Sequence, residues 1–199
     1  MRARAVWFAA MAAIAPLLAA ADNPRSAPVS LRADRIDIDQ RTGVSHYTGH
    51  VNLQQGATRI TAARATARSR GDVLERVTAE GNPATFRDQL PGETQPVHGT
   101  ALRLEYEAVA QRARLSRKVE IQHAGDTLRA DAVDYDLTTR RAHAERAVEI
   151  QHAGDTLRAG VIDYDLTSRH VRAERDAQTR VYMAVVPRRP ETPDDATPP

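Results

Sequence analysis

Two histidine–aspartate pairs recur at a fixed spacing. Asp126 follows His123 by three residues, and Asp155 follows His152 in the same way. Both side-chain types bind zinc, but a zinc site requires three or four ligands that converge on one point. Each histidine belongs to an alternating segment whose isoleucine faces inward, and from this we expect the histidines to face solvent. The sequence therefore predicts solvated strand ends with no metal and no cofactor.

Paired aspartates form a second candidate for chemistry. Two carboxylates can hydrolyse a glycoside when they flank the substrate and one has a raised pKa. In this chain each pair alternates with apolar residues, such as Ile36 and Ile38, so both carboxylates face outward. A carbohydrate-active enzyme would need an inward acid pair, so we expect a solvated face and no enzyme. The pairs are Asp37 and Asp39, Asp134 and Asp136, and Asp163 and Asp165.

An internal repeat organises the chain. The twelve residues from Val119 to Ala130 occur again, letter for letter, from Val148, which gives a period of 29 residues. Looser copies align on five alanines, with a ten-residue insertion placed between residues 88 and 96. A fixed period indicates stacked units that bury their apolar faces against their neighbours. The alanines are Ala33, Ala62, Ala101, Ala130 and Ala159.

Each repeat unit has the apolar alternation of β-strands. Apolar and polar residues alternate before the alanine and again after it, but in the opposite phase, as in Leu128 and Ala130 followed by Val133 and Tyr135. A change of phase requires a bend or bulge just after the alanine. Apolar stripes of helical period are absent beyond two turns. The sequence predicts an all-β stack of two-strand units of about 29 residues, with ten or more strands.

The chain begins with a segment typical of a secretory signal peptide. Arg2 and Arg4 precede an apolar run and the small residues 19–21, so we expect residues 1–21 to be removed near Ala21. The 28 basic and 26 acidic residues are then balanced, because two arginines leave, and this balance indicates no nucleic-acid partner. Residues 22–28 are predicted to be a flexible lead-in and residues 187–199 a disordered, proline-rich tail.

The interior allows two functions from different classes. Strand pairs that open slightly would form a long apolar trough able to carry a lipid. Strand pairs that close would form a structural or adhesive β-repeat protein with no ligand. An amphiphile distinguishes the two, because only a protein that binds it gains stability as its concentration rises.

Several phrases, read together, identify a known family. In order and spacing they resemble the LptA (OstA-like) lipopolysaccharide-export family over nearly the whole chain after the signal peptide. Two phrases depart from it: Thr48–His50 keeps most of the family's Thr-Gly-Asn motif, which is replaced at residues 116–118 and 145–147. One extra 29-residue unit lies near the C-terminus. The phrases are residues 28–34, 47–56, 81–86, 96–99 and 179–187.

The resemblance implies a fold, a ligand and partners. It implies an open, slightly twisted β-jellyroll over residues 29–186 in the periplasm. The protein would take lipopolysaccharide from an LptC-like inner-membrane protein and pass it to an LptD-like outer-membrane protein, both through OstA-like domains. The lipid A acyl chains would contact apolar interior positions. These positions are Val29, Leu31, Ile36, Ile38, Phe86, Leu104 and Tyr106.

An open stack also has two exposed sheet edges. Unpaired backbone groups at an edge invite another strand. At the C-terminal end the run from Arg180 to Val186 is strand-prone and uncharged after its first residue, and at the other end residues 29–33 form a short strand. We expect these edges to pair head to tail between copies, as the resemblance also implies. The expected edge residues are Val181, Tyr182, Met183, Ala184 and Val185.

Overall fold

The computed structural model describes residues 30–186, except 56, 72, 89–93, 108, 111, 137, 140, 166–167 and 169. The predicted signal peptide, lead-in and C-terminal tail, together with Val29, lie outside these residues. Strands and turns make up the described chain, and no helix capable of crossing a membrane occurs in it. The strands are β1 (Ser30–Arg32), β2 (Arg35–Asp39), β3 (Val44–Gln55), β4 (Thr58–Arg70), β5 (Val73–Asp88), β6 (Val97–Glu107), β7 (Arg112–His123), β8 (Asp126–Asp136), β9 (Arg141–His152), β10 (Asp155–Asp165), β11 (His170–Glu174) and β12 (Tyr182–Ala184).

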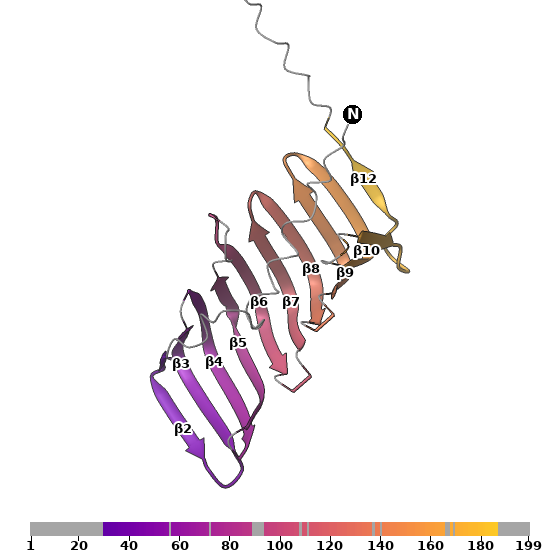
Figure 1. Cartoon of the computed structure of the whole chain (residues 1–199). Coiled ribbons are helices and arrows are strands. Elements are labelled where there is room, and N and C mark those ends of the chain that lie inside the picture. The colour runs from indigo at the N-terminus through magenta and orange to yellow at the C-terminus, as the bar shows by residue number, and fades with distance from the viewer. Residues whose placement is uncertain are drawn as a thin grey trace, which may run out of the picture.

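All twelve strands form one antiparallel sheet. From β3 to β10 each strand pairs with the next in sequence, so the sheet grows in one direction along the molecule (Figure 1). Both ends of the sheet are split: β1 and β2 share the outer side of β3, while β11 and β12 share the outer side of β10. The all-β, open β-jellyroll prediction is therefore confirmed.

A corner divides every long strand into two halves. The pairing register shifts at this point in each ladder, for example between Arg129 and Ala132 of β8. The bulge expected after the repeated alanine is thus confirmed. We call the two sides of the corner wing A and wing B. Wing A contains β1, β12 and the strand halves that meet at residues 55–58, 88–97, 123–126 and 152–155; wing B contains β2, β11 and the opposite halves.

The corners of β3, β7 and β9 use the left-handed backbone region. Gly49 and His50 have positive φ angles in β3, as expected of a glycine-containing motif. Arg117 and Lys118 in β7 adopt the same region without glycine, and so does the corner of β9. Each such residue costs roughly 1–2 kcal/mol relative to the right-handed region. The corner geometry therefore survives where the sequence departs from the family motif.

The inner sides of the two wings pack together into a core. Val119 and Ile121 from wing A and Val133 and Tyr135 from wing B belong to the same buried cluster, which extends from Phe86 to the C-terminal end. A smaller cluster lies at the N-terminal end and consists mainly of alanine. Because residues from both wings share a cluster, the sheet must fold over on itself at the corners.

Aspartates cap the turns of wing B. The Asp136 carboxylate accepts hydrogen bonds from the backbone N–H groups of Thr138 and Thr139, at 3.0 and 2.9 Å. The bond from Thr139 is the main reason that the pKa of Asp136 lies below its usual value. Asp39 and Asp165 cap the equivalent turns. These aspartates face outward as predicted, but they organise turns in addition to meeting solvent.

Candidate functional site

The inner side of wing A carries an apolar row that runs through the entire sheet. Each residue pairs with the next across neighbouring strands, from one edge to the other. The row continues without a break through the repeated units. Nine of its ten members are large apolar residues, which makes it a continuous hydrophobic strip. They are Leu31, Leu53, Ile60, Phe86, Gly99, Ile121, Leu128, Ile150, Leu157 and Met183.

The sequence-predicted lipid positions occupy three inner rows. Leu31 and Phe86 belong to the row of wing A described above. Following the pairings across wing B, Ile36 and Leu104 share one row. Ile38 shares the next inner row with Tyr106. The structure therefore places all six described positions on the inner side of the sheet.

Their exposure differs because of where each strand lies. Ile36 and Ile38 are 49% and 60% exposed since β2 is an edge strand whose inner side lacks a neighbour on one flank. Phe86 is only 3% exposed. Its ring lies over Gly99, where an added Cβ would fall 1.6 Å from a ring carbon. Phe86 therefore fills the interior of wing A at a point where the facing strand provides only a glycine.

The interior is packed less densely toward the N-terminal end. Its buried residues there are small, with Ala62, Ala65 and Ala79 still slightly exposed. The partly buried residues Tyr47 and Leu104 pack around them. Toward the C-terminal end, the cluster beginning at Phe86 is closed, with exposures from 0 to 7%. A long chain could enter the N-terminal part with less displacement of side chains.

A row of histidines and aspartates lines the interior, contrary to expectation. His123 and Asp126 are buried, and so is Asp155. The expectation of solvated strand ends was wrong because His123 lies two residues from Ile121 and therefore shares its inward face. His152 hydrogen-bonds to Asp126, whereas Nδ1 of His123 has no hydrogen-bond partner within the described residues. No group of three potential metal ligands converges among them.

Asp155 holds the last strand in place. Its carboxylate accepts a 2.6 Å hydrogen bond from the backbone N–H of Val186, just beyond β12. Asp126, one repeat earlier, instead faces His152 of the following strand. Sequence reasoning missed this role, although the repetition of Asp126 as Asp155 was visible. The same repeated aspartate thus serves a different neighbour at the end of the stack.

The outer side of wing B is covered by matched charges. Arg114 forms an ion pair with Asp134 on the neighbouring strand, and His143 contacts Asp163 at 2.6 Å. Nearer the N-terminal end, Glu80 has a lowered pKa, first because of its hydrogen bond from Arg64. A hollow of about 860 Å³ on wing B is lined mostly by such pairs. This face is therefore already neutralised by its own partners and has little attraction for an anionic ligand.

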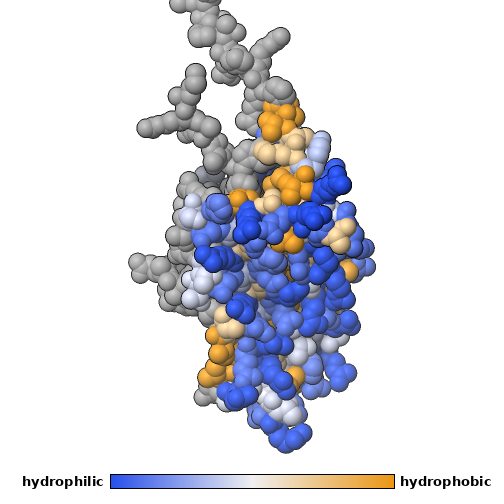
Figure 2. All heavy atoms as spheres, turned by 90° about the vertical axis from the view of Figure 1, so that its right-hand side faces the viewer, coloured by the Kyte–Doolittle hydropathy of each residue, from blue (hydrophilic) through white to orange (hydrophobic). Residues whose placement is uncertain are grey.

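The C-terminal edge exposes apolar side chains. β12 pairs with residues 156–158 of β10 and leaves its other side free of strands in the described structure. Figure 2 shows hydrophobic residues gathered where β12 lies, above a hydrophilic surface. Only residues 182–184 of the expected edge run form a strand, and the sequence did not reveal that β11 makes up the other half of this edge. The exposed residues are Val181, Tyr182, Met183, Val185 and Val186.

Known proteins with similar sequences share one description. The family model of the LptA/(LptD N-terminal domain) LPS transport protein matches residues 30–141. LptH of Pseudomonas aeruginosa, a lipopolysaccharide export system protein, is 27% identical over 113 residues, which are 56% of this chain and 64% of that protein. LptA of Escherichia coli K12 is 26% identical over 108 residues, which are 53% and 58% of the two chains. The match thus spans less than two thirds of either relative.

One solved structure shows the same fold. The crystal structure of LptH, described as the LptA homologous periplasmic component of the lipopolysaccharide transport device of P. aeruginosa, matches with a TM-score of 0.55. The match covers 82% of this chain and 99% of that one at 21% identity. At this identity the likeness concerns the fold.

Proposed function

Because the chain belongs to the LptA/(LptD N-terminal domain) family of LPS transport proteins, we propose that it carries lipopolysaccharide across the periplasm. In this proposal the protein binds lipid A in its apolar interior, without a cofactor and without catalysis. It receives the lipid from an LptC-like inner-membrane protein and passes it to an LptD-like outer-membrane protein. Residues 29–186 form the carrier domain, and residues 1–21 direct the chain to the periplasm.

The unbroken apolar row of wing A carries this proposal. A lipid that moves along a protein needs apolar contacts at every step, and a gap in the row would be a barrier of several kcal/mol for each long acyl chain. From Leu31 to Met183 each strand supplies an apolar residue except at Gly99, which Phe86 covers. The alanine-rich N-terminal part is the proposed point of entry, because small residues leave most room between the wings.

Site-specific crosslinking tests the interior location. A photo-reactive amino acid is placed at Leu31, Phe86 or Tyr106, and lipopolysaccharide is expected to be captured at each. Glu105 is the matched control, because it neighbours Tyr106 on β6 but faces outward, and Asp37 is a second outward control. Equal capture at inward and outward positions would contradict the proposal.

A specific observation favours a second candidate, a structural β-repeat protein with a closed core. The C-terminal cluster has almost no exposed area and is filled by its own side chains. In that case no ligand would enter and the repeats would serve only as a scaffold. The two candidates differ in whether lipopolysaccharide stabilises the folded protein, since a ligand that binds only the native state must raise its stability.

A further inference from the structure

The two edges of this sheet have complementary outward charges on wing B. Three rows of paired residues run along the outer side of this wing from β2 to β11. One row begins at Arg35 and ends at Glu174, and another begins at Asp37 and ends at Arg172. In each row the residues at the two edges have opposite charges. The next row begins at Asp39 and ends at His170, but the Asp39 carboxylate is already used by its own turn.

We propose that a second copy of this chain docks on each edge in the one register that continues these rows, with Arg35 opposite Glu174 and Asp37 opposite Arg172. This inference rests on the head-to-tail joining proposed above, but not on lipid binding. The strand directions permit it: β11 and β12 run antiparallel to β10, and β1 and β2 run antiparallel to β3, so the joint continues the antiparallel alternation. The β11 edge therefore meets the β2 edge, and β12 meets β1.

The inner side supports the same register. Continuing the inner rows places Ala173 of one copy opposite Ile36 of the next, and Val171 opposite Ile38. Ile36 and Ile38 are among the most exposed large apolar residues of the described chain, and this joint would cover them. On wing A the same alignment brings Met183 beside Leu31, so the apolar strip continues into the next copy.

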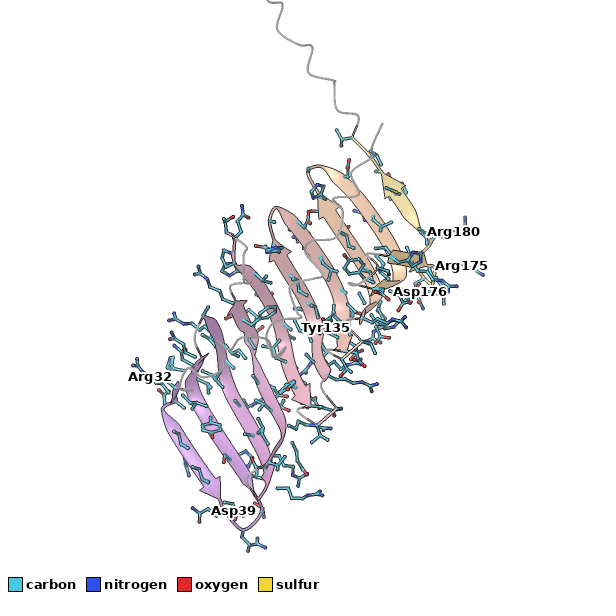
Figure 3. The ribbon with its side chains drawn as sticks, viewed as in Figure 1. Arg32, Asp39, Tyr135, Arg175, Asp176 and Arg180 are labelled. Carbon is cyan, nitrogen blue, oxygen red and sulfur yellow. The ribbon has the colours of Figure 1, made fainter. Side chains whose placement is uncertain are left out.

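Arg32 and Tyr182 face each other across this joint on the outer side of wing A. Both are exposed at opposite ends of the molecule. Figure 3 shows Arg32 at the N-terminal end and Arg175, Asp176 and Arg180 at the C-terminal end. An arginine over a tyrosine ring adds a cation–π attraction. No contact between Arg32 and a carboxylate is present in the described structure, so its charge is available for this purpose.

Other registers bring like charges together. A slip of two residues in one direction places Asp37 opposite Glu174, and a slip of two in the other places Arg35 opposite Arg172. A slip of one residue turns the apolar side of the edge strand outward. Like charges directly opposite in a sheet are destabilising. The charges therefore select the register, while backbone pairing and apolar contacts provide the attraction.

The occupant is a second copy because the two complementary surfaces belong to the same chain. In the separate molecule the charges of each edge contact only one another: Arg35 lies 3.8 Å from Asp37, and Arg172 lies 2.5 Å from Glu174. These side chains are exposed, with 77% and 62% for the first pair and 71% and 48% for the second. Assembly gives each of them a cross-strand partner of opposite charge.

Reversing one charge at a time tests this register. Sedimentation velocity measures assembly over a concentration series without lipopolysaccharide, so a failure of lipid binding does not affect the result. Asp37→Arg opposes Arg172 of the next copy, and Arg172→Asp opposes its Asp37. Each variant alone is expected to assemble about 2- to 30-fold more weakly, because an attraction becomes a repulsion. Arg87→Asp, which changes an exposed residue on β5 away from both edges, is the control and should assemble like the parent.

Mixing the two variants provides the decisive comparison. Every joint between unlike copies then contains one positive and one negative residue, so an equimolar mixture is expected to regain the assembly of the parent protein. The double variant should do the same. Parent-like assembly of both single variants, or no recovery in the mixture, would overturn the register. A parent protein that remains monomeric at all concentrations would overturn the choice of a second copy as the partner.

Discussion

Removing one repeat should leave a folded but less stable protein. Deletion of residues 130–158 joins Arg129 directly to Ala159 and removes 29 residues, which is one repeat period. The remaining half-strand carries the partners that β11 and β12 now find on β10, since Thr127 and Arg129 replace Thr156 and Arg158 with identical residue types. Asp126 then stands where Asp155 did, ready to accept the backbone N–H of Val186.

The size of the loss follows from the number of residues removed. Globular proteins have about 0.05–0.15 kcal/mol of stability per residue, so 29 residues correspond to about 1.5–4 kcal/mol. In a stack the loss should be confined to one unit and its contact with a neighbour. The dependence of unfolding free energy on urea should also fall by roughly a fifth, because less surface becomes exposed.

A second deletion of the same length serves as a matched control. Removing residues 132–160 yields the same sequence except that Asp131 replaces Gly160 at the join. A Cβ at Gly160 would lie 2.3–2.5 Å from atoms of Asp176, in the loop between β11 and β12. This control should be less stable than the first deletion by about 1–3 kcal/mol. Urea unfolding followed by circular dichroism measures both. A first deletion variant that is wholly unfolded would refute the stacked description and favour a single indivisible core.

Three further predictions concern single residues. Gly99→Ala should cost about 1–3 kcal/mol in urea unfolding, because the new methyl group displaces the Phe86 ring; an unchanged midpoint would contradict this contact. Asp155→Ala should release β12 and speed hydrogen exchange at residues 182–184 while β5 keeps its protection, and equal exchange would refute the anchoring role. The lowered pKa of Asp136 means that its contribution to stability is present above about pH 4 and is lost as the pH falls through that pKa. Asp136→Asn should therefore reduce the acid dependence of unfolding, and an unchanged pH profile would count against the turn cap.

The repeat and the strand phase made most of the fold predictable. Identical segments at Val119 and Val148 indicated stacking, and the phase change after Ala130 indicated the corner. Both are local properties of the sequence, because alternation and bulges depend on neighbouring residues. The split of the edge strands was less visible. It depends on long-range pairing of short segments such as residues 170–174 and 182–184 with β10.

The interior was predicted less well than the sheet. The six described lipid positions face inward as the alternation requires, but the histidine row was assigned to the wrong side. The error arose because His123 was compared with its neighbour in the chain instead of with Ile121, two residues away. Whether the wings open or close depends on packing between residues distant in sequence, such as Ile121 and Tyr135. No local pattern reports that distance.

Thermal unfolding in the presence of lipopolysaccharide tests most directly whether the interior binds lipid. At constant detergent, the unfolding midpoint should rise with ligand concentration, by about 5–11 °C at a hundredfold excess over the dissociation constant, which corresponds to about 2.7 kcal/mol. The core oligosaccharide freed of lipid A should leave the midpoint unchanged, because it has no acyl chains for the apolar rows. A midpoint that does not move with lipopolysaccharide, or that moves equally with the oligosaccharide, would contradict a lipid-carrying interior.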